Sequence, residues 1–258
     1  MSEKNTNKIA LLIDADNASY KLIGEIISEA GKFGKVTIRR AYGDFTDEHL
    51  KGWKDVINTY AIRPMQKFAY TSGKNSTDSA MIIDAMDILH DEAVTGFCIV
   101  SSDSDYTGLA TRIREEGVSV IGIGQSKTPE AFQKACEIFV FTENLVPQKI
   151  VQEKSNNDAK PKKLQAVKIT DLAKVVSKID KKPIDIEMLD KAVRMAIDSN
   201  GLAYMSTIKE KIKTLDPSFD TRTYGFGSMT TLFKSLADKY EFVYKNDGSS
   251  LYVKPKFN

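Results

Sequence analysis

The first 145 residues alternate between short apolar runs and segments in which apolar residues recur at helical spacing. The short runs predict buried strands, and they lie at residues 8–13, 36–42, 61–68, 96–100, 118–123 and 138–142. Apolar residues three and four positions apart predict helices, and these segments lie at 19–30, 47–58, 77–90, 106–116 and 129–135. Because strands alternate with helices, the pattern predicts an α/β fold in which helices flank a parallel sheet.

The pattern changes after residue 145. Residues 146–168 have no apolar periodicity and contain the string KSNNDAKPKK, which predicts a flexible, lysine-rich linker. Beyond it, helical spacing predicts helices at 169–179, 186–200, 206–215 and 228–239, and the string KNDG joins two strand-like runs at 241–244 and 250–253. Helices followed by a terminal hairpin indicate a winged-helix domain. The sequence therefore predicts an α/β domain over residues 1–145, a linker over 146–168 and a second, smaller domain over 169–258.

The net charge of +2 conceals a difference between the two halves of the chain. Residues 1–145 contain 16 Lys and Arg against 21 Asp and Glu, whereas residues 146–258 contain 21 against 14. The linker alone contains six Lys against one Asp and one Glu. An acidic domain is thus followed by a basic tether and a mildly basic domain, which calls for a different role in each half.

Composition narrows the class of protein. No apolar run approaches the roughly 20 residues that cross a bilayer, so we expect no association with a membrane. The N-terminus, MSEKNTNKIALLID, has too short an apolar stretch for a signal peptide. Cys98 and Cys136 lie in apolar surroundings, which argues against a disulfide scaffold and against a cysteine-ligated zinc site. We therefore expect a cytoplasmic protein.

Three polar clusters follow predicted strands or open a predicted helix. Residues 14–17 come directly after the first strand, residues 101–105 follow the strand at 96–100, and residues 74–78 open the helix at 77–90. Ligands of parallel α/β sheets bind outside the carboxyl ends of the strands, so we expect these clusters to meet at one edge. Helix capping would explain any one of them. Three clusters on the same edge favour a metal site instead.

Four carboxylates are expected to hold the metal and to position water, namely Asp14, Asp78, Asp103 and Asp105. Crowded carboxylates repel one another and raise one another's pKa, and a divalent cation removes that conflict. Ligands that are all oxygen atoms favour Mg²⁺ or Mn²⁺ over zinc. Because such an ion activates water, the expected reaction is metal-assisted hydrolysis of a phosphodiester.

Four further residues have supporting roles in this hypothesis. Asp16 and Asn17 are expected to support the ligands, although Asn17 also suits a helix cap. Asp84 lies six residues after Asp78, about 240° around a helix, so the two carboxylates are not expected to point at the same ion. Lys74, on the segment before that helix, is the candidate for a phosphate contact.

These motifs, in this order, resemble those of the NYN domain, a family of PIN-like nucleases. The strings are IDADN at 13–17, KNSTDSAMIIDA at 74–85, SSDSDY at 101–106 and GVSVIGIG at 117–124. The resemblance covers about residues 7–145 and implies a metal-dependent ribonuclease with its acidic site at the strand ends.

The resemblance also implies roles for individual residues. It implies that Asp14 is the aspartate of the first strand, with Asn17 as its companion. It places the mid-domain aspartate at Asp78, with Asp84 in an accessory position, and the last pair at Asp103 and Asp105. Three positions depart from residues common in the family, namely Ala15, Ser102 and Tyr106. These departures leave every acidic position in place.

The C-terminal region resembles a LOTUS domain, also called OST-HTH. The resemblance rests on DPSFD at 216–220, on Tyr224 with Gly225 and on the terminal hairpin, and it spans about residues 170–255. It implies a small winged-helix module associated with RNA binding and with protein partners. The residues expected to contact RNA are cationic or aromatic: Lys209, Lys213, Arg222 and Tyr224. A solvated helix face would explain the lysines equally well.

The leading hypothesis is a metal-dependent endoribonuclease whose C-terminal module binds RNA or a protein partner. The alternative is a catalytically inactive RNA-binding or adaptor protein that retains the same acidic edge. A haloacid-dehalogenase-like phosphatase is a further alternative, because DADN resembles the opening motif of those enzymes. Their late carboxylates lie four residues apart, however, whereas Asp103 and Asp105 lie two apart.

Overall fold

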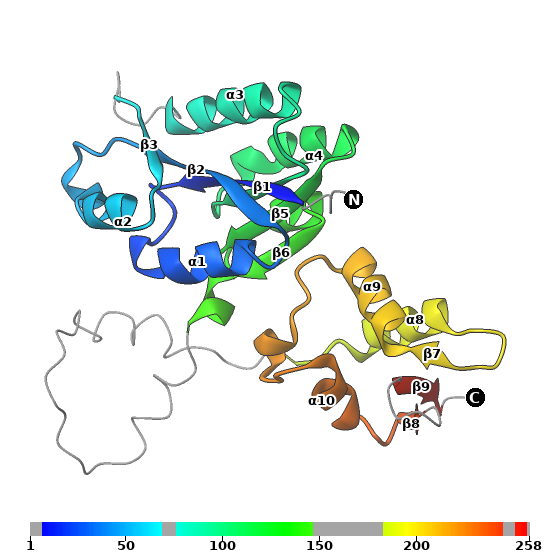
Figure 1. Cartoon of the computed structure of the whole chain (residues 1–258). Coiled ribbons are helices and arrows are strands. Elements are labelled where there is room, and N and C mark those ends of the chain that lie inside the picture. The colour runs from blue at the N-terminus through cyan, green and yellow to red at the C-terminus, as the bar shows by residue number, and fades with distance from the viewer. Residues whose placement is uncertain (1–6, 69–75, 147–182, 245–250, 257–258) are drawn as a thin grey trace, which may run out of the picture. The chain divides into compact units, whose positions relative to one another are not determined.

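The computed structural model describes residues 7–68, 76–146, 183–244 and 251–256 (Figure 1). These residues form a six-stranded sheet with helices in the N-terminal part of the chain, and helices with a three-stranded sheet in the C-terminal part. Two expectations from the sequence lie outside the described residues: the helix at 169–179 and the KNDG turn between the last two strands. Most of the linker at 146–168 lies outside them as well.

The N-terminal sheet has the strand order β3-β2-β1-β4-β5-β6. Its strands are β1 (Lys8–Asp14), β2 (Lys35–Gly43), β3 (Arg63–Gln66), β4 (Gly96–Val100), β5 (Ser119–Gly124) and β6 (Ile138–Phe141). β1 pairs in parallel with β2 on one side and with β4 on the other, so that Leu12 lies opposite both Arg40 and Ile99. All six strands predicted from the sequence are present, and the parallel sheet flanked by helices is confirmed.

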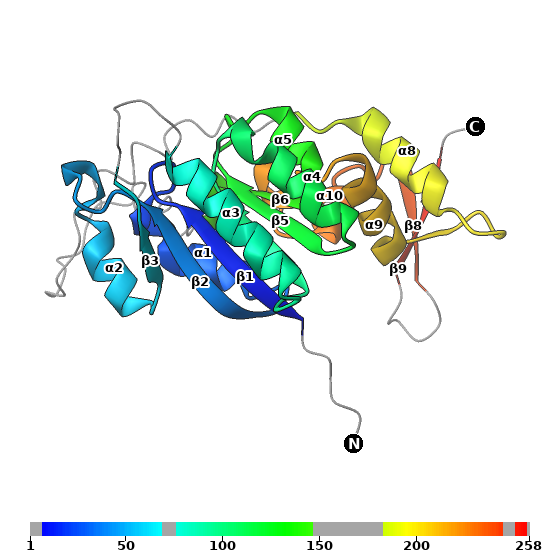
Figure 2. The same ribbon diagram turned by 90° about the horizontal axis from the view of Figure 1, so that it is seen from above.

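The connections between these strands contain the helices. These elements are η1 (Tyr20–Leu22), α1 (Ile23–Ala30), η2 (Glu48–Leu50), α2 (Trp53–Thr59), α3 (Ser76–His90), η3 (Ser104–Tyr106), α4 (Thr107–Glu115), α5 (Glu130–Ala135) and η4 (Thr142–Leu145). The sequence predicted single helices at 19–30 and 47–58, but each begins with a separate 3₁₀ turn, η1 or η2. Figure 2 shows α1 and α3 on opposite faces of the strands β1 and β2.

The central strands are buried because helices cover both faces of the sheet. Every residue of β4 is buried, and so is every residue of β1 after Lys8. Strands in this position are expected to be continuous apolar runs rather than alternating ones, as KIALLI and GFCIV are. Asp14, the last residue of β1, is the exception, since it is a carboxylate with no exposed surface.

The strand order reverses at β1. The chain runs from β1 outward through β2 to β3 and then returns to place β4 on the other side of β1. The segments that follow β1 and β4 therefore leave the sheet in opposite directions and form a crevice at its carboxyl edge, the usual location of ligands in such sheets. The first and third polar clusters of the sequence follow these two strands.

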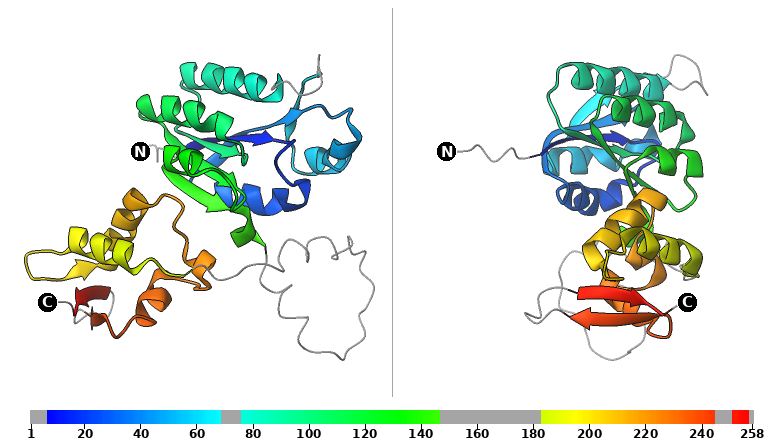
Figure 3. Two further views of the ribbon diagram at one scale, coloured as in Figure 1. Left: turned by 180° about the vertical axis from the view of Figure 1, so that it is seen from behind. Right: turned by 90° about the vertical axis from the view of Figure 1, so that its right-hand side faces the viewer.

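The C-terminal region has its own core around helices α8 (Ile186–Ala196) and α9 (Met205–Leu215), which pack against each other (Figure 3). The remaining elements are β7 (Ala203–Tyr204), η5 (Thr221–Tyr224), α10 (Met229–Lys234), β8 (Tyr240–Tyr244) and β9 (Leu251–Pro255). The three strands form an antiparallel sheet in the order β7-β9-β8. This small domain of helices with a terminal antiparallel sheet agrees with the second, smaller domain expected from the sequence.

Two differences from the predicted elements have local causes. Strand β7 is only two residues long, too short to produce an alternating pattern, and the sequence did not predict it. The helix predicted at 228–239 ends after Lys234, and Ser228 begins it with a capping box that includes Thr231. Within the described part of the chain, every helix is too short or too polar to cross a lipid bilayer.

Candidate active site

Asp14 is the buried centre of the carboxyl edge. Its Oδ1 accepts hydrogen bonds from the backbone N–H groups of Asp16 (3.1 Å) and Asn17 (3.3 Å). Its Oδ2 accepts from Nδ2 of Asn17 (2.7 Å) and from Oγ of Ser101 (2.8 Å). Burial raises the pKa of Asp14, and the hydrogen bonds from Asn17 and Ser101 partly oppose that increase. Both carboxylate oxygens are therefore engaged by the protein itself.

The loop after β1 is shaped by these bonds and by its backbone. The N–H of Ala15 donates to the carbonyl of Tyr42 in β2 (2.9 Å), and the N–H of Ala18 donates to the carbonyl of Asp14 (2.8 Å). Asp14 also connects two strands, because Ser101 comes directly after β4. The DADN string thus folds into a turn whose first carboxylate is internal and whose second, Asp16, is exposed.

Asp16 interacts with the first turn of α3 and with the segment after β2. Partial burial raises the pKa of Asp16, a hydrogen bond with the Thr77 side chain lowers it, and the negative charges of Asp78, Asp47 and Asp44 raise it further. A carboxylate whose pKa is raised by neighbouring carboxylates lies in a region of concentrated negative charge. Asp16, predicted only as a supporting residue, is the carboxylate on which these charges converge.

Asp44 and Asp47 were missed by the reasoning from sequence. Asp44 is the first residue after β2, so the rule that directed attention to strand ends could have found it. Its Oδ1 accepts from Nε2 of Gln66 (2.7 Å) and from the backbone N–H of Thr46 (3.1 Å). Asp47 caps η2 by accepting from the backbone N–H of His49 (2.8 Å). Both carboxylates therefore have local structural roles as well as an electrostatic effect on Asp16.

Asp103 and Asp105 lie on the segment after β4, as the sequence indicated. The backbone N–H of Asp103 donates to Oγ of Ser101 (3.1 Å), the same hydroxyl that donates to Asp14. Asp103 is half-buried, and Asp105 is exposed within η3. In the described segments, no group of three or more His, Cys, Asp or Glu side chains is arranged to hold a metal ion. The structure therefore does not gather Asp14, Asp78, Asp103 and Asp105 into a single ligand set.

The chemistry of the donors still suits a hard divalent cation. Mg²⁺ is commonly bound by one or two carboxylates and completes its octahedron with water and substrate oxygens, so it does not require a cage of three side chains. Asp16 and Asp78 are two carboxylates close enough for the charge of Asp78 to raise the pKa of Asp16. Asp14 is better suited to fixing the loop after β1 than to binding an ion, because its oxygens already accept four hydrogen bonds.

Asp84 is engaged away from this pair. Its two oxygens accept hydrogen bonds from Nη1 of Arg40 and from Oη of Tyr42, both on β2. Burial and the bond to Asp84 raise the pKa of Tyr42 above its usual range, so the phenol stays protonated as the donor. The two carboxylates Asp78 and Asp84 were expected to point in different directions from the same helix, and these contacts of Asp84 agree with that expectation. The contacts of Asp84 indicate that it fastens α3 to the sheet.

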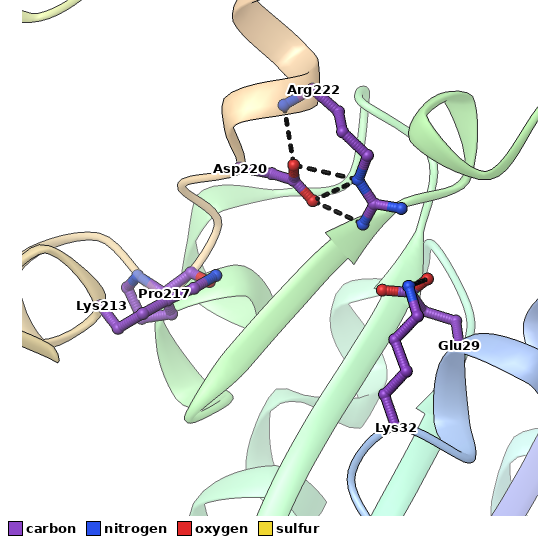
Figure 4. Close-up of polar contacts among 6 residues, drawn as sticks. All are labelled: Glu29, Lys32, Lys213, Pro217, Asp220 and Arg222. Carbon is purple, nitrogen blue, oxygen red and sulfur yellow. Dashed lines mark hydrogen bonds and ion pairs between the residues drawn. The ribbon is translucent and has the colours of Figure 1, made fainter. Parts of the chain in front are cut away.

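The C-terminal residues expected to bind RNA are mostly occupied by contacts of their own (Figure 4). Nζ of Lys213 donates to the carbonyl of Pro217 (3.0 Å), and burial lowers the pKa of Lys213 to about 8. Arg222 forms an ion pair with Asp220, with Nη2 2.6 Å from Oδ2 and Nε 3.0 Å from each carboxylate oxygen. Lys209 on α9 is exposed. Lys74 lies outside the described residues.

Tyr224 requires a correction. We expected its ring to stack on an unpaired base, but only 6% of the residue is exposed. The ring lies 5.2 Å from that of Phe219, and both belong to the core of the C-terminal region. The polar residues around Tyr224 in the sequence do not indicate whether its side chain is buried or exposed. In the structure it is buried in the apolar core. Tyr224 therefore does not offer the stacking surface predicted from the sequence.

Comparisons with known proteins agree with the two regions. The family model of the NYN domain matches residues 8–145, and that of the OST-HTH/LOTUS domain matches residues 166–252. No curated protein matches the chain with significance.

Two solved structures resemble parts of the chain. A crystal structure of a protein of unknown function from Vibrio parahaemolyticus has 21% sequence identity and a TM-score of 0.46, over 54% of this chain and 94% of that one. A solution NMR structure of an uncharacterised protein from Nitrosomonas europaea has 21% identity and a TM-score of 0.28, over 40% of this chain and 93% of that one.

Proposed function

The chain belongs to the NYN domain family, and from this premise we propose that it is a metal-dependent endoribonuclease that hydrolyses phosphodiester bonds of RNA. NYN domains are generally nucleases. The observation that carries the proposal is the carboxyl edge of the sheet, where Asp16 and Asp78 repel each other beside the buried Asp14. A site with concentrated negative charge and only oxygen donors suits Mg²⁺ or Mn²⁺.

The residues of this edge have different roles in the proposal. Asp16 and Asp78 would hold the ion. A bound divalent cation supplies charge stabilisation for the phosphate and a water of lowered pKa. Asp14, fixed by Asn17 and Ser101, holds the loop that carries Asp16. Asp103 and Asp105 remain proposed members of the site, because they follow β4 at the same edge.

The C-terminal region is proposed to recruit RNA or a protein partner. LOTUS domains are associated with RNA binding, and the family match supports that assignment. Exposed lysines such as Lys209 provide sequence-independent attraction to phosphates. The linker contributes six lysines. This tether would raise the local concentration of RNA near the acidic edge.

Cleavage of RNA under controlled metal conditions tests the proposal. Full-length protein is incubated with single-stranded and structured RNA in the presence of Mn²⁺, with and without EDTA. We expect internal cuts that EDTA abolishes and that Asp16→Asn, Asp78→Asn and Asp103→Asn reduce. Asp87→Asn is the matched control, because Asp87 is an exposed residue of the same helix as Asp78 and carries the same charge.

Two outcomes would contradict the proposal. If cleavage survives in the Asp16→Asn and Asp78→Asn variants, the active site lies elsewhere. If no RNA is cut with any divalent metal while RNA binding persists, the chain is an RNA-binding or adaptor protein with an inactive acidic edge.

A further inference from the structure

A pocket with a volume of about 290 Å³ opens beside Asp14 at the point where the strand order reverses. Its walls come from the segments that follow β1, β4, β5 and β6, together with part of α1. This is the position in which open α/β sheets bind their ligands. The volume is close to the lower end of the range for small-molecule sites, about 300–1,000 Å³, and suits a single compact ligand.

Two wall residues connect the pocket to the acidic edge. Asn17 and Ser101 line it, and both donate hydrogen bonds to Oδ2 of Asp14, at 2.7 and 2.8 Å. A molecule in the pocket would therefore contact the two residues that hold Asp14.

The lining combines apolar surface with a polar rim. The larger apolar residues come from η1, from α1, from strand ends and from the segment after η4: Leu22, Ile26, Val100, Ile123 and Val146. The uncharged polar residues come from the connecting segments: Asn17, Ser19, Ser101, Ser102, Gln125 and Thr142. A flat heteroaromatic ring has the complementary character, because its faces are apolar and its edge carries donors and acceptors.

The charges in the lining disfavour a phosphate group. Lys21 and Glu143 are the charged residues among those that form the walls. A phosphate would meet the carboxylate of Glu143 together with a single cation, whereas phosphate sites usually offer several donors or cations. A neutral ring meets no such repulsion, so the base of a nucleotide suits the pocket better than its phosphate does.

Glu143 is a fixed hydrogen-bond acceptor. Its Oε1 accepts from the backbone N–H of Ser126 (2.9 Å) and from Oγ of Ser126 (2.8 Å), and its Oε2 accepts from Oγ of Thr142 (3.2 Å). Each carboxylate oxygen has about two acceptor sites, so Oε1 is fully occupied and Oε2 retains one site for a ligand. A carboxylate held in this way accepts one N–H donor from a ligand. Every RNA base presents at least one N–H donor at its edge.

We propose that this pocket binds one nucleobase of the RNA substrate, with one N–H at the edge of the base donating to Glu143. The inference rests on the proposed ribonuclease function and specifies the group of the substrate that is bound beside Asp14. In this proposal the apolar residues of the wall contact the faces of the base, and the polar residues of the rim form hydrogen bonds with its edge.

Binding of mononucleotides tests the pocket separately from catalysis. Isothermal titration of the full-length protein in EDTA compares the 5′-monophosphates of guanosine, adenosine, cytidine and uridine with ribose 5-phosphate, which lacks a base. We expect the four nucleotides to bind and ribose 5-phosphate not to bind. Because the titration contains no metal, binding is measured whether or not the protein cleaves RNA.

Two variants locate the binding. Ala18→Phe adds bulk to the pocket wall and is expected to weaken guanosine monophosphate binding at least about tenfold, through lost contacts. Ala131→Phe is the control, because Ala131 is an exposed residue of α5 that does not line the pocket. Glu143→Gln is expected to weaken nucleotide binding by about tenfold, because it removes the charged acceptor.

The outcomes separate the two proposals. No measurable binding of any nucleotide, or binding that Ala18→Phe leaves unchanged, would overturn the base pocket even if the protein cleaves RNA. Nucleotide affinity that Glu143→Gln leaves unchanged would overturn the role of Glu143. Base binding without cleavage would leave the pocket supported and remove the proposed nuclease activity.

Discussion

The two regions of this chain differ in what their charged and aromatic side chains do. At the carboxyl edge of the N-terminal sheet, Asp16 is exposed and other carboxylates converge on it. In the C-terminal region, Lys213 and Arg222 are held by contacts within the region, and Tyr224 is part of the core. Asp16 was thus left available at the edge of the N-terminal sheet, whereas the C-terminal residues Lys213, Arg222 and Tyr224 were incorporated into the fold.

Topology explains the difference. A parallel sheet with its strand order reversed at β1 directs the ends of β1 and β4 to one crevice, whichever residues occupy them. In a small helical domain, each helix has one buried and one exposed face, and single lysines or tyrosines near the boundary can belong to either. Position relative to a strand end therefore predicted which side chains share one edge, whereas residue type within a helix did not predict which side chains are exposed.

The largest expected effect concerns the acidic edge. Asp16→Asn is predicted to reduce RNA cleavage at least about 100-fold, because it removes a proposed metal ligand, and to weaken Mn²⁺ binding in a direct titration. Asp87→Asn should change neither. If Asp16→Asn cleaves RNA like the wild type, the convergence of carboxylates on Asp16 is not the basis of the site.

The second effect concerns the core of the C-terminal region. Tyr224→Ala is predicted to lower the free energy of unfolding of that region by about 3–5 kcal/mol, as truncation of a buried aromatic residue does. Denaturant unfolding followed by tyrosine fluorescence measures it, and Tyr224→Phe, which keeps the ring, is the control. A loss of RNA affinity with unchanged stability would restore the stacking role and weaken the contrast between the regions.

The third prediction uses the pH dependence of Asp14. Burial raises the pKa of this group in the folded protein, so its contribution to stability is present at low pH and is lost as pH rises through the folded pKa. Asp14→Asn removes that titration. The free energy of unfolding of the variant, relative to the wild type, should therefore increase from pH 4 to pH 7.

Unfolding curves of both proteins at several pH values measure this difference. The asparagine amide cannot replace every hydrogen bond of Asp14, and this loss lowers the free energy of unfolding of the variant by an amount that does not depend on pH. The change of the difference with pH is therefore unaffected. A difference that is flat over this range would show that the hydrogen bonds to Asp14 cancel the effect of its burial on its pKa.

The smallest effect distinguishes two lysines on one helix. Lys209 and Lys213 lie four residues apart on α9, but Lys209 is exposed whereas Lys213 is bonded to Pro217. Lys209→Met is predicted to weaken RNA binding about twofold to threefold and to reduce the slope of log affinity against log salt by about one. Lys213→Met should leave that slope unchanged. Equal effects of both substitutions would show that the bond to Pro217 does not withhold Lys213 from RNA.

Much of the N-terminal fold followed from periodicity. Six strands and the helices between them could be located because buried strands are continuous apolar runs and amphipathic helices repeat every three to four residues. The 3₁₀ turns η1 and η2 and the two-residue strand β7 were not predictable, since each is too short to establish a period. The family resemblances of both regions were visible from ordered motifs and agree with the family models.

The candidate site could be predicted only in part. The strand-end rule located Asp14, Asp16 and Asp103, but it did not reveal that Asp14 is buried with both oxygens engaged. It also did not reveal that Asp84 pairs with Arg40 and Tyr42. Such pairings join residues more than forty positions apart, and nothing local in the sequence specifies them.

The sequence by itself determined which segments become strands and helices, where the acidic motifs lie and which families the two regions resemble. The tertiary structure decided which carboxylate is internal, which carboxylates raise the pKa of Asp16, that a pocket forms beside Asp14 and that Tyr224 enters a core. The physical reason is that periodicity reflects burial of a whole element, whereas the environment of one side chain depends on neighbours contributed by distant parts of the chain.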